Sequence, residues 1–277
     1  MKTAHKIALA KVAYTLLHGA RRIIGKTDNC IVTRGGKRFA LNLAEGIDFA
    51  IYLGVYETST TNALPRLVNP GNNILDIGAN IGVHTLHTAA LVGPRGRVFA
   101  FEPTTFAFGK LQRNLEINPG LRDRVIATQC FLGPQNAQSA PAAIYSSWPL
   151  KGGADRHHKH LGQPMATDGV ATKSIDEFLA ERGNPPIALV KMDVDGYECD
   201  VLAGSTLMMR RDRPIFVMEL APYLLQEHGK SLDELIAYFE PLGYRFFNEA
   251  ETLTLPFDKI SQHISDGASI NVVARAQ

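Results

Sequence analysis

The sequence contains few cysteines and no long apolar run, and each shortage excludes a class of protein. Its 277 residues include only three cysteines, Cys30, Cys130 and Cys199, which are far apart and form no C-x-x-C pair. Zinc ribbons and disulfide-stapled secreted folds depend on such pairs, so neither is expected, and we predict a cytoplasmic protein. A membrane-spanning helix needs about 20 consecutive apolar residues, which the chain also lacks.

An excess of charge of one sign is missing as well. Lysine and arginine together number 29, aspartate and glutamate 27, and the formal net charge is +2. Proteins that bind nucleic acids usually carry a basic patch or stripe, and the body of this chain has none. We therefore expect no nucleic-acid partner. The length and the 45% apolar content suit one large α/β domain with a sizeable core.

Residues 1–25 differ from the rest in composition. Basic residues such as Lys11 and Arg21 interrupt the apolar ones, so the segment lacks the continuous apolar centre of a signal peptide, and no convincing cleavage site follows. We predict a surface helix packed on the domain. The alternative is a helix that lies at a membrane surface or forms a dimer contact.

Residues 74–102 are the most informative part of the chain. A short apolar run that ends at Ile77 predicts a buried parallel strand. Gly78 and Gly82 follow, where glycine allows a tight bend and a close approach of the backbone to a ligand. A helix over 83–91 comes next. This order predicts the first half of a β-α-β unit that binds a nucleoside.

The residue types around this bend indicate which nucleoside is bound. Dinucleotide sites use G-x-G-x-x-G, but position 80 is Asn, and Asp76 would repel a pyrophosphate. An acid at position 76 instead suits an ammonium or sulfonium group. The next strand, over 98–101, is followed by Glu102, whose carboxylate could accept hydrogen bonds from ribose hydroxyls. S-adenosylmethionine carries all of these groups, so we expect it as the cofactor.

The remaining pattern alternates between strands and helices. Short strands are expected within residues 30–60, and the segment 133–169, rich in Gly, Pro, Ala, Ser and His, is expected to be a lid or insertion. The other predicted strands are 125–130, 170–172, 187–192, 215–218, 244–247 and 270–274, and the other predicted helices are 60–69, 104–118, 175–182, 198–210 and 232–240. This alternation predicts an α/β fold with a doubly wound sheet.

Four acids fall at the predicted carboxyl ends of strands, where ligands of such sheets bind: Asp76, Glu102, Asp193 and Glu219. We therefore expect these acids to meet at one edge of the sheet. Asp193 is the first candidate for a catalytic base that accepts the proton of an acceptor hydroxyl, or for a ligand of a divalent cation. A purely structural role, in which its carboxylate caps the next helix, is the alternative.

Four segments of the chain resemble the FkbM family of class I S-adenosylmethionine-dependent methyltransferases: Leu75–Gly82, Phe101–Pro103, Ser174–Phe178 and Val190–Glu198. The similarity covers roughly residues 45–275. It implies a Rossmann-like seven-stranded sheet whose last strand is antiparallel, to which residues 1–44 would add a helix and short strands. It also implies O-methylation, often of sugar hydroxyls in glycans, glycolipids or natural products.

The resemblance also implies which residues bind the cofactor: Gly78, Asn80 and Gly82 beside the methionine part, Glu102 on the ribose, and Phe101 and Pro103 beside the adenine. Glu57, which precedes the motif, could touch the cofactor as well. Asp195 departs from the family pattern, because Glu is usual at this position. Its carboxylate is therefore one methylene shorter, and we list it only among residues that could contact the substrate.

Several further side chains could act in the site. Lys191 could pair with Asp193 or face the substrate, and Glu219 could face the substrate at its strand end. His84, after the glycine bend, is a rival base, although a packed helix histidine is the common outcome. In a late loop, His263 is a candidate for acceptor contact.

The run Asp155-Arg156-His157-His158-Lys159-His160 resembles a metal cluster, but its Arg and Lys would repel a cation. We predict a lid from which His158 could reach the substrate. The whole sequence therefore predicts an O-methyltransferase for a sugar, glycan or glycosylated small molecule. The alternatives are an RNA or protein methyltransferase on the same fold, and a non-catalytic module that binds the cofactor.

Overall fold

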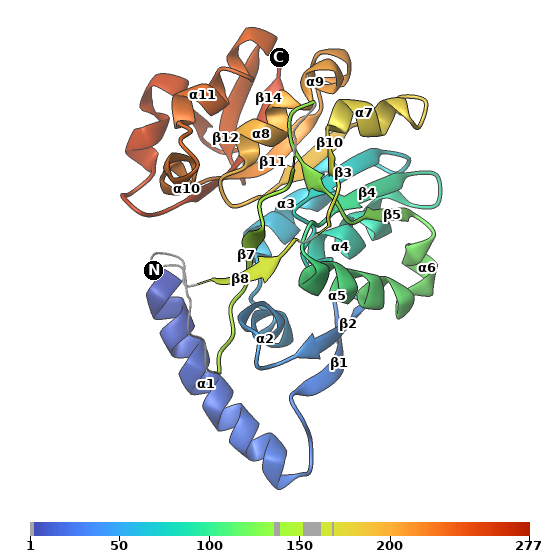
Figure 1. Ribbon diagram of the computed structural model, residues 1–277, viewed down its shortest axis with the longest axis vertical. Helices are drawn as coiled ribbons and strands as arrows, with labels where there is room; N and C mark the ends of the chain where they lie inside the picture. The colour runs from blue at the N-terminus through green and yellow to red at the C-terminus, as the bar shows by residue number, and fades with distance from the viewer. Residues whose placement is uncertain (1–2, 136–138, 152–161, 168) are drawn as a thin grey trace.

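A twisted sheet of eight strands with helices on both faces organises the chain in the computed structural model (Figure 1). The structure describes residues 3–135, 139–151, 162–167 and 169–277, with residues 3–8 as backbone only. The strand order is β13 (Thr254–Leu255), β12 (Tyr244–Asn248), β14 (Ile270–Ala276), β11 (Ile215–Leu220), β10 (Leu189–Met192), β3 (Asn73–Ile77), β4 (Arg97–Phe101) and β5 (Val125–Thr128).

The strands from β11 to β5 pair in parallel, whereas β14 runs antiparallel to both of its neighbours, β11 and β12. The predicted doubly wound, Rossmann-like sheet with an antiparallel last strand is therefore confirmed. The sheet has one strand more than expected, because the two-residue strand β13 pairs with the edge of β12. Its short length explains why the sequence pattern did not reveal it.

The central strands are apolar because helices cover both faces of the sheet. In β3 and β10, Ile74, Leu75 and Leu189 are fully buried. Two polar residues break the run, Asp76 in β3 and Lys191 in β10, and they are direct neighbours in the parallel register. An acid and a base therefore face one another in the buried middle of the sheet.

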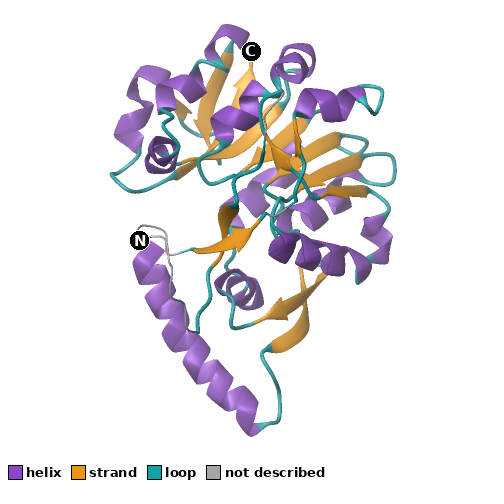
Figure 2. Ribbon diagram, in the orientation of Figure 1, coloured by secondary structure: helices purple, strands orange, loops and turns teal. Residues whose placement is uncertain are grey.

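Two sets of helices cover the sheet (Figure 2). One face packs against helices that contribute to a large aromatic and aliphatic core, namely α7 (Ile175–Ala180), α8 (Glu198–Ala203), α9 (Thr206–Asp212), α10 (Pro222–Glu227) and α11 (Leu232–Ile236). The other face packs against α3 (Thr58–Leu67), α4 (Val83–Val92), α5 (Thr105–Glu116) and the short α6 (Pro119–Arg122). Two 3-10 helices, η1 (Glu240–Leu242) and η2 (Phe257–His263), complete the C-terminal part.

Local sequence signals explain how several of these helices begin. Ser174 and Glu177, spaced three residues apart, form a capping box at α7. The Asp176 carboxylate accepts hydrogen bonds from the backbone N–H groups of Leu207 and Met208, at 2.9 Å each, and so caps α9. The helix expected over 198–210 is wrong as one piece, because the chain bends between α8 and α9.

The N-terminal helix α1 (Thr3–Ile23) packs on α2 (Gly46–Leu53) (Figure 1). Tyr14 of α1 is buried and meets Phe49 of α2 edge to face, with 5.8 Å between ring centroids. Its hydroxyl donates to Asp28 at 2.9 Å. The other face of α1 is exposed and apolar: Leu9, Val12 and Leu16 are 60–72% accessible. Among the helices of the described residues, none is both long and apolar enough to cross a membrane.

The expectation that residues 30–60 form only strands is wrong for α2. The hairpin of β1 (Asn29–Arg34) and β2 (Lys37–Asn42) is present, but the segment after it is helical. Buried Asp48, near the start of α2, accepts a hydrogen bond from the backbone of Asn42 and pairs with Lys110 of α5. These contacts across the chain stabilise a helix that local patterning did not indicate.

The described part of the segment 133–169, expected to be a lid or insertion, contributes a two-stranded ribbon, β7 (Ala143–Ser147) with β8 (Gln163–Ala166). Next to it, β6 (Phe131–Leu132) pairs in parallel with β9 (Thr172–Lys173). The chain after β7 is fixed to the start of α2, because the backbone N–H of Gly46 donates to the Trp148 carbonyl at 2.8 Å. His158 and the rest of the run 155–160 lie outside the described residues.

We expect Phe178→Ala to destabilise the protein by about 3–5 kcal/mol, the usual cost of removing a fully buried phenylalanine. The ring of Phe178 in α7 is fully buried and meets Phe101 of β4 edge to face at 4.7 Å. Urea unfolding followed by circular dichroism would measure the change. Phe106→Ala is the control, because that ring is 37% exposed. Equal losses in the two variants would contradict this account of the core.

Candidate active site

A cavity of about 910 Å³ opens where the carboxyl ends of β3, β4, β10 and β11 meet. One end of it is lined by the glycine bend and by the residues after β4, and the other end by apolar residues of α1 and α2. The lining residues with predicted roles are Glu57, Gly78, Asn80, Phe101, Glu102, Pro103, Asp193, Asp195 and Glu219. The structure thus brings together most of the side chains that the sequence predicts for one site.

The glycine bend is held against the loop that follows β10. Gly78 has φ +75°, and a Cβ there would overlap the carbonyl oxygen of Asp193. The backbone N–H groups of Gly78 and Ala79 both donate to the Phe101 carbonyl, at 3.0 and 2.9 Å. Gly82, with φ +91°, leaves space for the side chain of Leu111. Glycine is needed at both positions because the protein's own atoms approach so closely.

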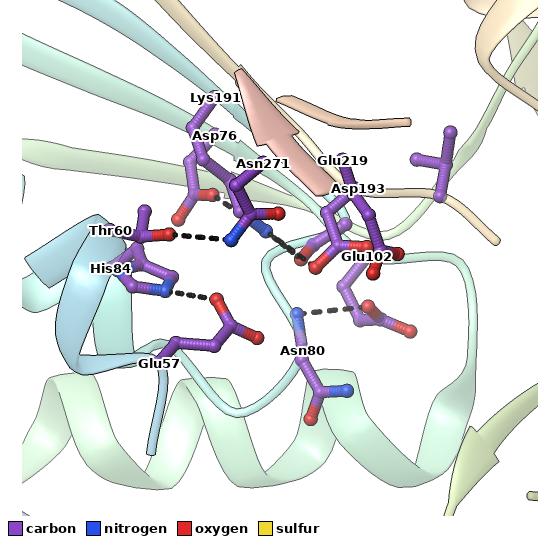
Figure 3. Close-up of polar contacts among 12 residues, drawn as sticks. Glu57, Thr60, Asp76, Asn80, His84, Glu102, Lys191, Asp193, Glu219 and Asn271 are labelled. Atoms are coloured by element: carbon purple, nitrogen blue, oxygen red, sulfur yellow. Dashed lines mark hydrogen bonds and ion pairs between the residues drawn. The ribbon is translucent and has the colours of Figure 1, made fainter. Parts of the chain in front are cut away.

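Glu102 is buried and oriented by three hydrogen bonds. Its Oε1 accepts from the backbone N–H and the hydroxyl of Thr104, at 2.9 and 2.6 Å, and its Oε2 accepts from the backbone N–H of Asn80 at 3.0 Å (Figure 3). Burial raises the pKa of Glu102, and these hydrogen bonds oppose the shift. A carboxylate has about four acceptor positions, so capacity remains for a ligand hydroxyl.

Asp76 does not line the cavity. Its side chain is buried, and its Oδ2 accepts a hydrogen bond from the Thr85 hydroxyl at 2.5 Å. Its Oδ1 lies 4.0 Å from the ammonium of Lys191 and has no hydrogen-bond partner among the described residues. Contact of Asp76 with the cofactor therefore stays a prediction, and the geometry places its carboxylate behind the glycine bend.

The ammonium of Lys191 joins the glycine bend to the strand tips. It donates to the carbonyl of Gly78 at 3.2 Å and lies 3.6 Å from Oδ2 of Asp193 (Figure 3). Burial favours the neutral amine, but the surrounding carboxylates of Asp193, Asp76 and Glu57 outweigh it and raise the pKa of Lys191. Lys191 is therefore charged and binds Asp193, as the sequence suggests.

The loop after β10 presents a group of acids. Asp195 adopts a left-handed conformation with φ +50°, and the next residue, Gly196, has φ +100°. Glu198 stabilises this turn, because its Oε1 lies 3.4 Å from the backbone N–H groups of Val194 and Gly196. Burial raises the pKa of Asp193, opposed by the Lys191 charge, and raises that of Asp195 further, aided by Asp193.

Glu57 is the acid that enters the site from outside the sheet. It precedes α3 in a left-handed conformation with φ +36°, and its Oε2 lies 2.6 Å from Nε2 of His84 (Figure 3). Burial would raise the pKa of Glu57, but the bond to His84 and its charge, with that of Lys191, lower it to about 2. His84 is buried and lines neither cavity, so it lies behind Glu57 and orients that carboxylate.

A second cavity, of about 380 Å³, adjoins the first on the side of α3. The two cavities share Val55, Glu57, Asp193, Glu219 and Ser269. The smaller one is otherwise lined mainly by polar residues that sequence reasoning missed, namely Thr58, Ser59, Thr60 and Asn271. The run of hydroxyl residues at 58–61 was a visible signal for the first three, whereas Asn271 carried none.

The predicted roles of two histidines and of a metal ion stay untested. His263, at the end of η2, is exposed and lines neither cavity, and His158 lies outside the described residues, so both roles stay predictions. Within the described parts of the chain, no three His, Cys, Asp or Glu side chains are grouped so that they could hold a metal ion. A cation at Asp193 likewise stays a prediction.

The strand order, the antiparallel last strand and the glycine bend between two acidic strand tips define a Rossmann-like fold of the class I methyltransferase type. The profile of the Methyltransferase FkbM domain matches residues 76–246. The chain therefore belongs to the FkbM methyltransferase family.

Two proteins similar to this chain are named as methyltransferases, one as a 2-O-methyltransferase and one as a hexuronic acid methyltransferase. The 2-O-methyltransferase NoeI of Sinorhizobium fredii is 30% identical over 160 residues, which are 54% of this chain and 64% of that protein. The hexuronic acid methyltransferase AglP of Haloferax volcanii is 33% identical over 134 residues, 47% of this chain and 48% of that protein. The chain thus spans about half to two thirds of the length of these relatives.

Among solved structures, Methyltransferase FkbM from Methylobacillus flagellatus is 13% identical to this chain, with a TM-score of 0.43. The alignment covers 78% of this chain and 52% of that one.

Gly78→Ala should destabilise the protein far more than Gly243→Ala. Both glycines have positive φ, +75° and +70°, so each substitution incurs a positive-φ backbone cost of about 1–2 kcal/mol. Only at Gly78 would the new Cβ also overlap backbone, whereas at Gly243 no atom lies within 4 Å of it. The difference between the free energies of unfolding of the two variants, measured in urea, gives the cost of the overlap between the new Cβ and the backbone. Equal stabilities would show that the two loops are not in close contact.

Two buried acids have raised pKa values, so we expect their contribution to the free energy of unfolding to decrease as pH rises. Burial raises the pKa of Glu198 to about 7 and that of Glu219 to about 8, both above their ordinary value of 4.5. The folded state therefore binds protons more tightly than the unfolded chain, and this contribution is complete below pH 4.5 and lost as pH rises through about 7 and 8.

We expect Glu219→Gln to flatten the pH dependence of the free energy of unfolding between about pH 4.5 and 8. Urea titrations at several pH values would measure it. The exposed Glu240→Gln is the matched control and should leave the slope as in the wild type. The burial argument fails if the Glu219 variant keeps the wild-type slope.

Proposed function

We propose that this protein is an S-adenosylmethionine-dependent O-methyltransferase that acts on a hydroxyl of a sugar, glycan or glycosylated small molecule. The observation that carries the proposal is one continuous cavity, with the glycine bend and Glu102 at one end and the Asp193 carboxylate where the polar cavity joins it. The membership in the FkbM methyltransferase family and the printed names of the two relatives support it.

The residues present fit the cofactor. Glu102 keeps acceptor capacity for ribose hydroxyls, and the cavity walls beside it are largely apolar, as an adenine ring requires. These walls include Phe101, Pro103, Cys130, Phe131 and Leu132. Acids predominate where the charged end of the cofactor would lie, which suits its ammonium and sulfonium groups. When bound, the cofactor supplies a methyl group that is activated by the sulfonium charge.

Glu57 is better placed than Asp76 to accept the cofactor's ammonium group. It lines both cavities, whereas Asp76 is turned away and bonded to Thr85. The low pKa of Glu57, about 2, keeps its carboxylate charged at neutral pH. In this proposal Asp76 acts indirectly, because it attracts Lys191, which in turn holds the glycine bend.

Asp193 is our candidate for the catalytic base. A sugar hydroxyl is a weak nucleophile, and a carboxylate that removes its proton makes the oxygen reactive. Burial raises the pKa of Asp193 and so makes it a stronger proton acceptor, while Lys191 keeps it oriented. Glu219 lines the same junction, with a pKa of about 8, and would be protonated and able to donate a hydrogen bond to the acceptor at neutral pH.

Two features bear on the alternatives. The polar cavity is narrow and acidic, which favours a hydroxylated small acceptor over RNA, whose phosphates would be repelled. A non-catalytic module would have no need of a buried acid beside the cofactor pocket. Transfer of a labelled methyl group to a panel of glycans tests the proposal, and a protein that binds S-adenosylhomocysteine but labels none of many acceptors would favour the module.

The exposed apolar face of α1 is the basis for a further part of this proposal. Leu9, Val12 and Leu16 lie three and four residues apart and are largely exposed, as in helices that lie at a membrane surface or in a dimer contact. We place the protein in the cytoplasm, with α1 as its contact to one of these two partners.

Glu102→Ala should weaken the binding of S-adenosylhomocysteine by about 1.5–3 kcal/mol, which is the usual contribution of a hydrogen bond to a charged group. Isothermal calorimetry measures the affinity, and circular dichroism checks that the variant is folded. The surface variant Glu116→Ala is the control, because its side chain is 54% exposed on α5. Unchanged affinity in the Glu102 variant would remove that residue from the cofactor site.

A further inference from the structure

The smaller cavity has the chemistry of a saccharide subsite. Its walls come from four separate segments: the start of α3, the ends of β10 and β11, and the start of β14. Hydroxyl groups of Thr58, Ser59, Thr60 and Ser269, the carboxamide of Asn271 and three carboxylates line it. Such mixed donors and acceptors suit the many hydroxyls of a sugar ring, whereas the larger cavity beside it is lined mostly by apolar residues.

Its polar groups are held in place by neighbouring side chains. Asn271 and Glu219 are direct partners in the antiparallel register of β14 and β11, so their side chains lie on one face of the sheet. Asn271 Nδ2 donates to the Thr60 hydroxyl at 3.4 Å (Figure 3). That hydroxyl donates to Glu249 at 2.6 Å. Ser269 donates its hydroxyl proton to Glu219. A preorganised wall of this kind favours a specific ligand over water.

The charges of the cavity discriminate among sugars. Among the described residues that line the cavity are the carboxyl groups of Glu57, Asp193 and Glu219 but a single cation, Lys191. Lys191 is already committed, because Asp193 and Asp76 lie 3.6 and 4.0 Å from its ammonium. An anionic sugar would therefore meet like charge and find no guanidinium or free ammonium among these described residues to bind its carboxylate.

We infer that this cavity binds the ring of the acceptor that carries the reacting hydroxyl, and that it selects a neutral sugar and rejects a hexuronate. The inference rests on the proposed function, because it assigns the acceptor side of the same site. It separates this chain from AglP, which is named as a hexuronic acid methyltransferase. Asn271, Thr60 and Glu219 are then the residues that determine which sugar is accepted.

The test uses matched sugars that differ only at C6. Methyl glucopyranoside and methyl galactopyranoside are compared with the corresponding uronides, by ligand-observed NMR titration of the full chain saturated with S-adenosylhomocysteine. We expect the neutral member of each pair to bind at least about tenfold more tightly, since like charges at close range disfavour the uronide. Equal or tighter binding of the uronides would overturn the inference.

Substitutions in the wall of the smaller cavity test whether the sugar binds there. Asn271→Leu keeps the approximate side-chain size but removes the hydrogen-bonding group, and should weaken binding of the neutral glycosides about tenfold while leaving the affinity for S-adenosylhomocysteine unchanged. Thr254→Val, on the exposed edge strand β13, is the matched control and should bind both as the wild type does. Wild-type glycoside affinity in the Asn271 variant would place the acceptor elsewhere.

At about pH 9, above the pKa of about 8 at which Glu219 loses its proton, Glu219→Gln removes one negative charge from the wall and should reduce the preference for the neutral sugars over the uronides. An unchanged preference would contradict the charge argument. Calorimetry with S-adenosylhomocysteine separates the two levels of the proposal. If the cofactor product binds but none of the glycosides does, the inference falls while the proposed methyltransferase stands. If the cofactor product does not bind, the proposed function falls, and this inference falls with it.

Discussion

The site depends on one buried ammonium group. Lys191 lies in the second of two adjacent parallel strands, opposite Asp76 of the first, and reaches both the carbonyl of Gly78 and the carboxylate of Asp193. An isolated charge at this depth would be strongly destabilised, so Lys191 and the carboxylates of Asp76 and Asp193 stabilise one another. The result is a single electrostatic unit that fixes the glycine bend relative to the strand tip.

The charge of Lys191 and its paired carboxylates explain how several acids can lie close together in one site. Burial raises the pKa values of Asp193, Asp195, Glu198 and Glu219, and the neighbouring charge of Asp193 raises those of the other three further. A cation at the base of the group limits that repulsion at Asp193. The site therefore holds acids in different protonation states within a short range, which is the arrangement that proton transfer at neutral pH requires.

The sheet and the cofactor end of the site could be predicted from the sequence because their signals are local. Ile77, Gly78 and Glu102 lie on a single β-α-β unit, and the parallel sheet brings every strand tip to one edge without further information. The prediction that Asp76 faces the ligand remains open. The sequence predicts that a residue lies near the end of a strand, but it does not predict to which side its side chain points. Asp76 lies one residue before the end of β3, and its side chain points toward Thr85 and Lys191.

The rest of the site could not be read from local pattern. Helix α2 forms because Asp48 pairs with Lys110, 62 residues further along the chain, and the polar cavity arises where α3 meets β14, from opposite ends of the sequence. The contact of Thr60 with Asn271 spans 211 positions.

Under the proposed function, specificity for the acceptor depends on contacts between segments that are distant in the sequence, whereas binding of the cofactor depends on contacts within one β-α-β unit. These two parts of the site are therefore free to change independently. Substitutions at Thr60, Asn271 or Ser269 would alter the wall proposed to face the acceptor and leave the bend at Gly78 and the acid at Glu102 untouched. A family that shares the bend could in this way act on many acceptors, because the residues proposed to select the acceptor lie outside the segment proposed to bind the cofactor.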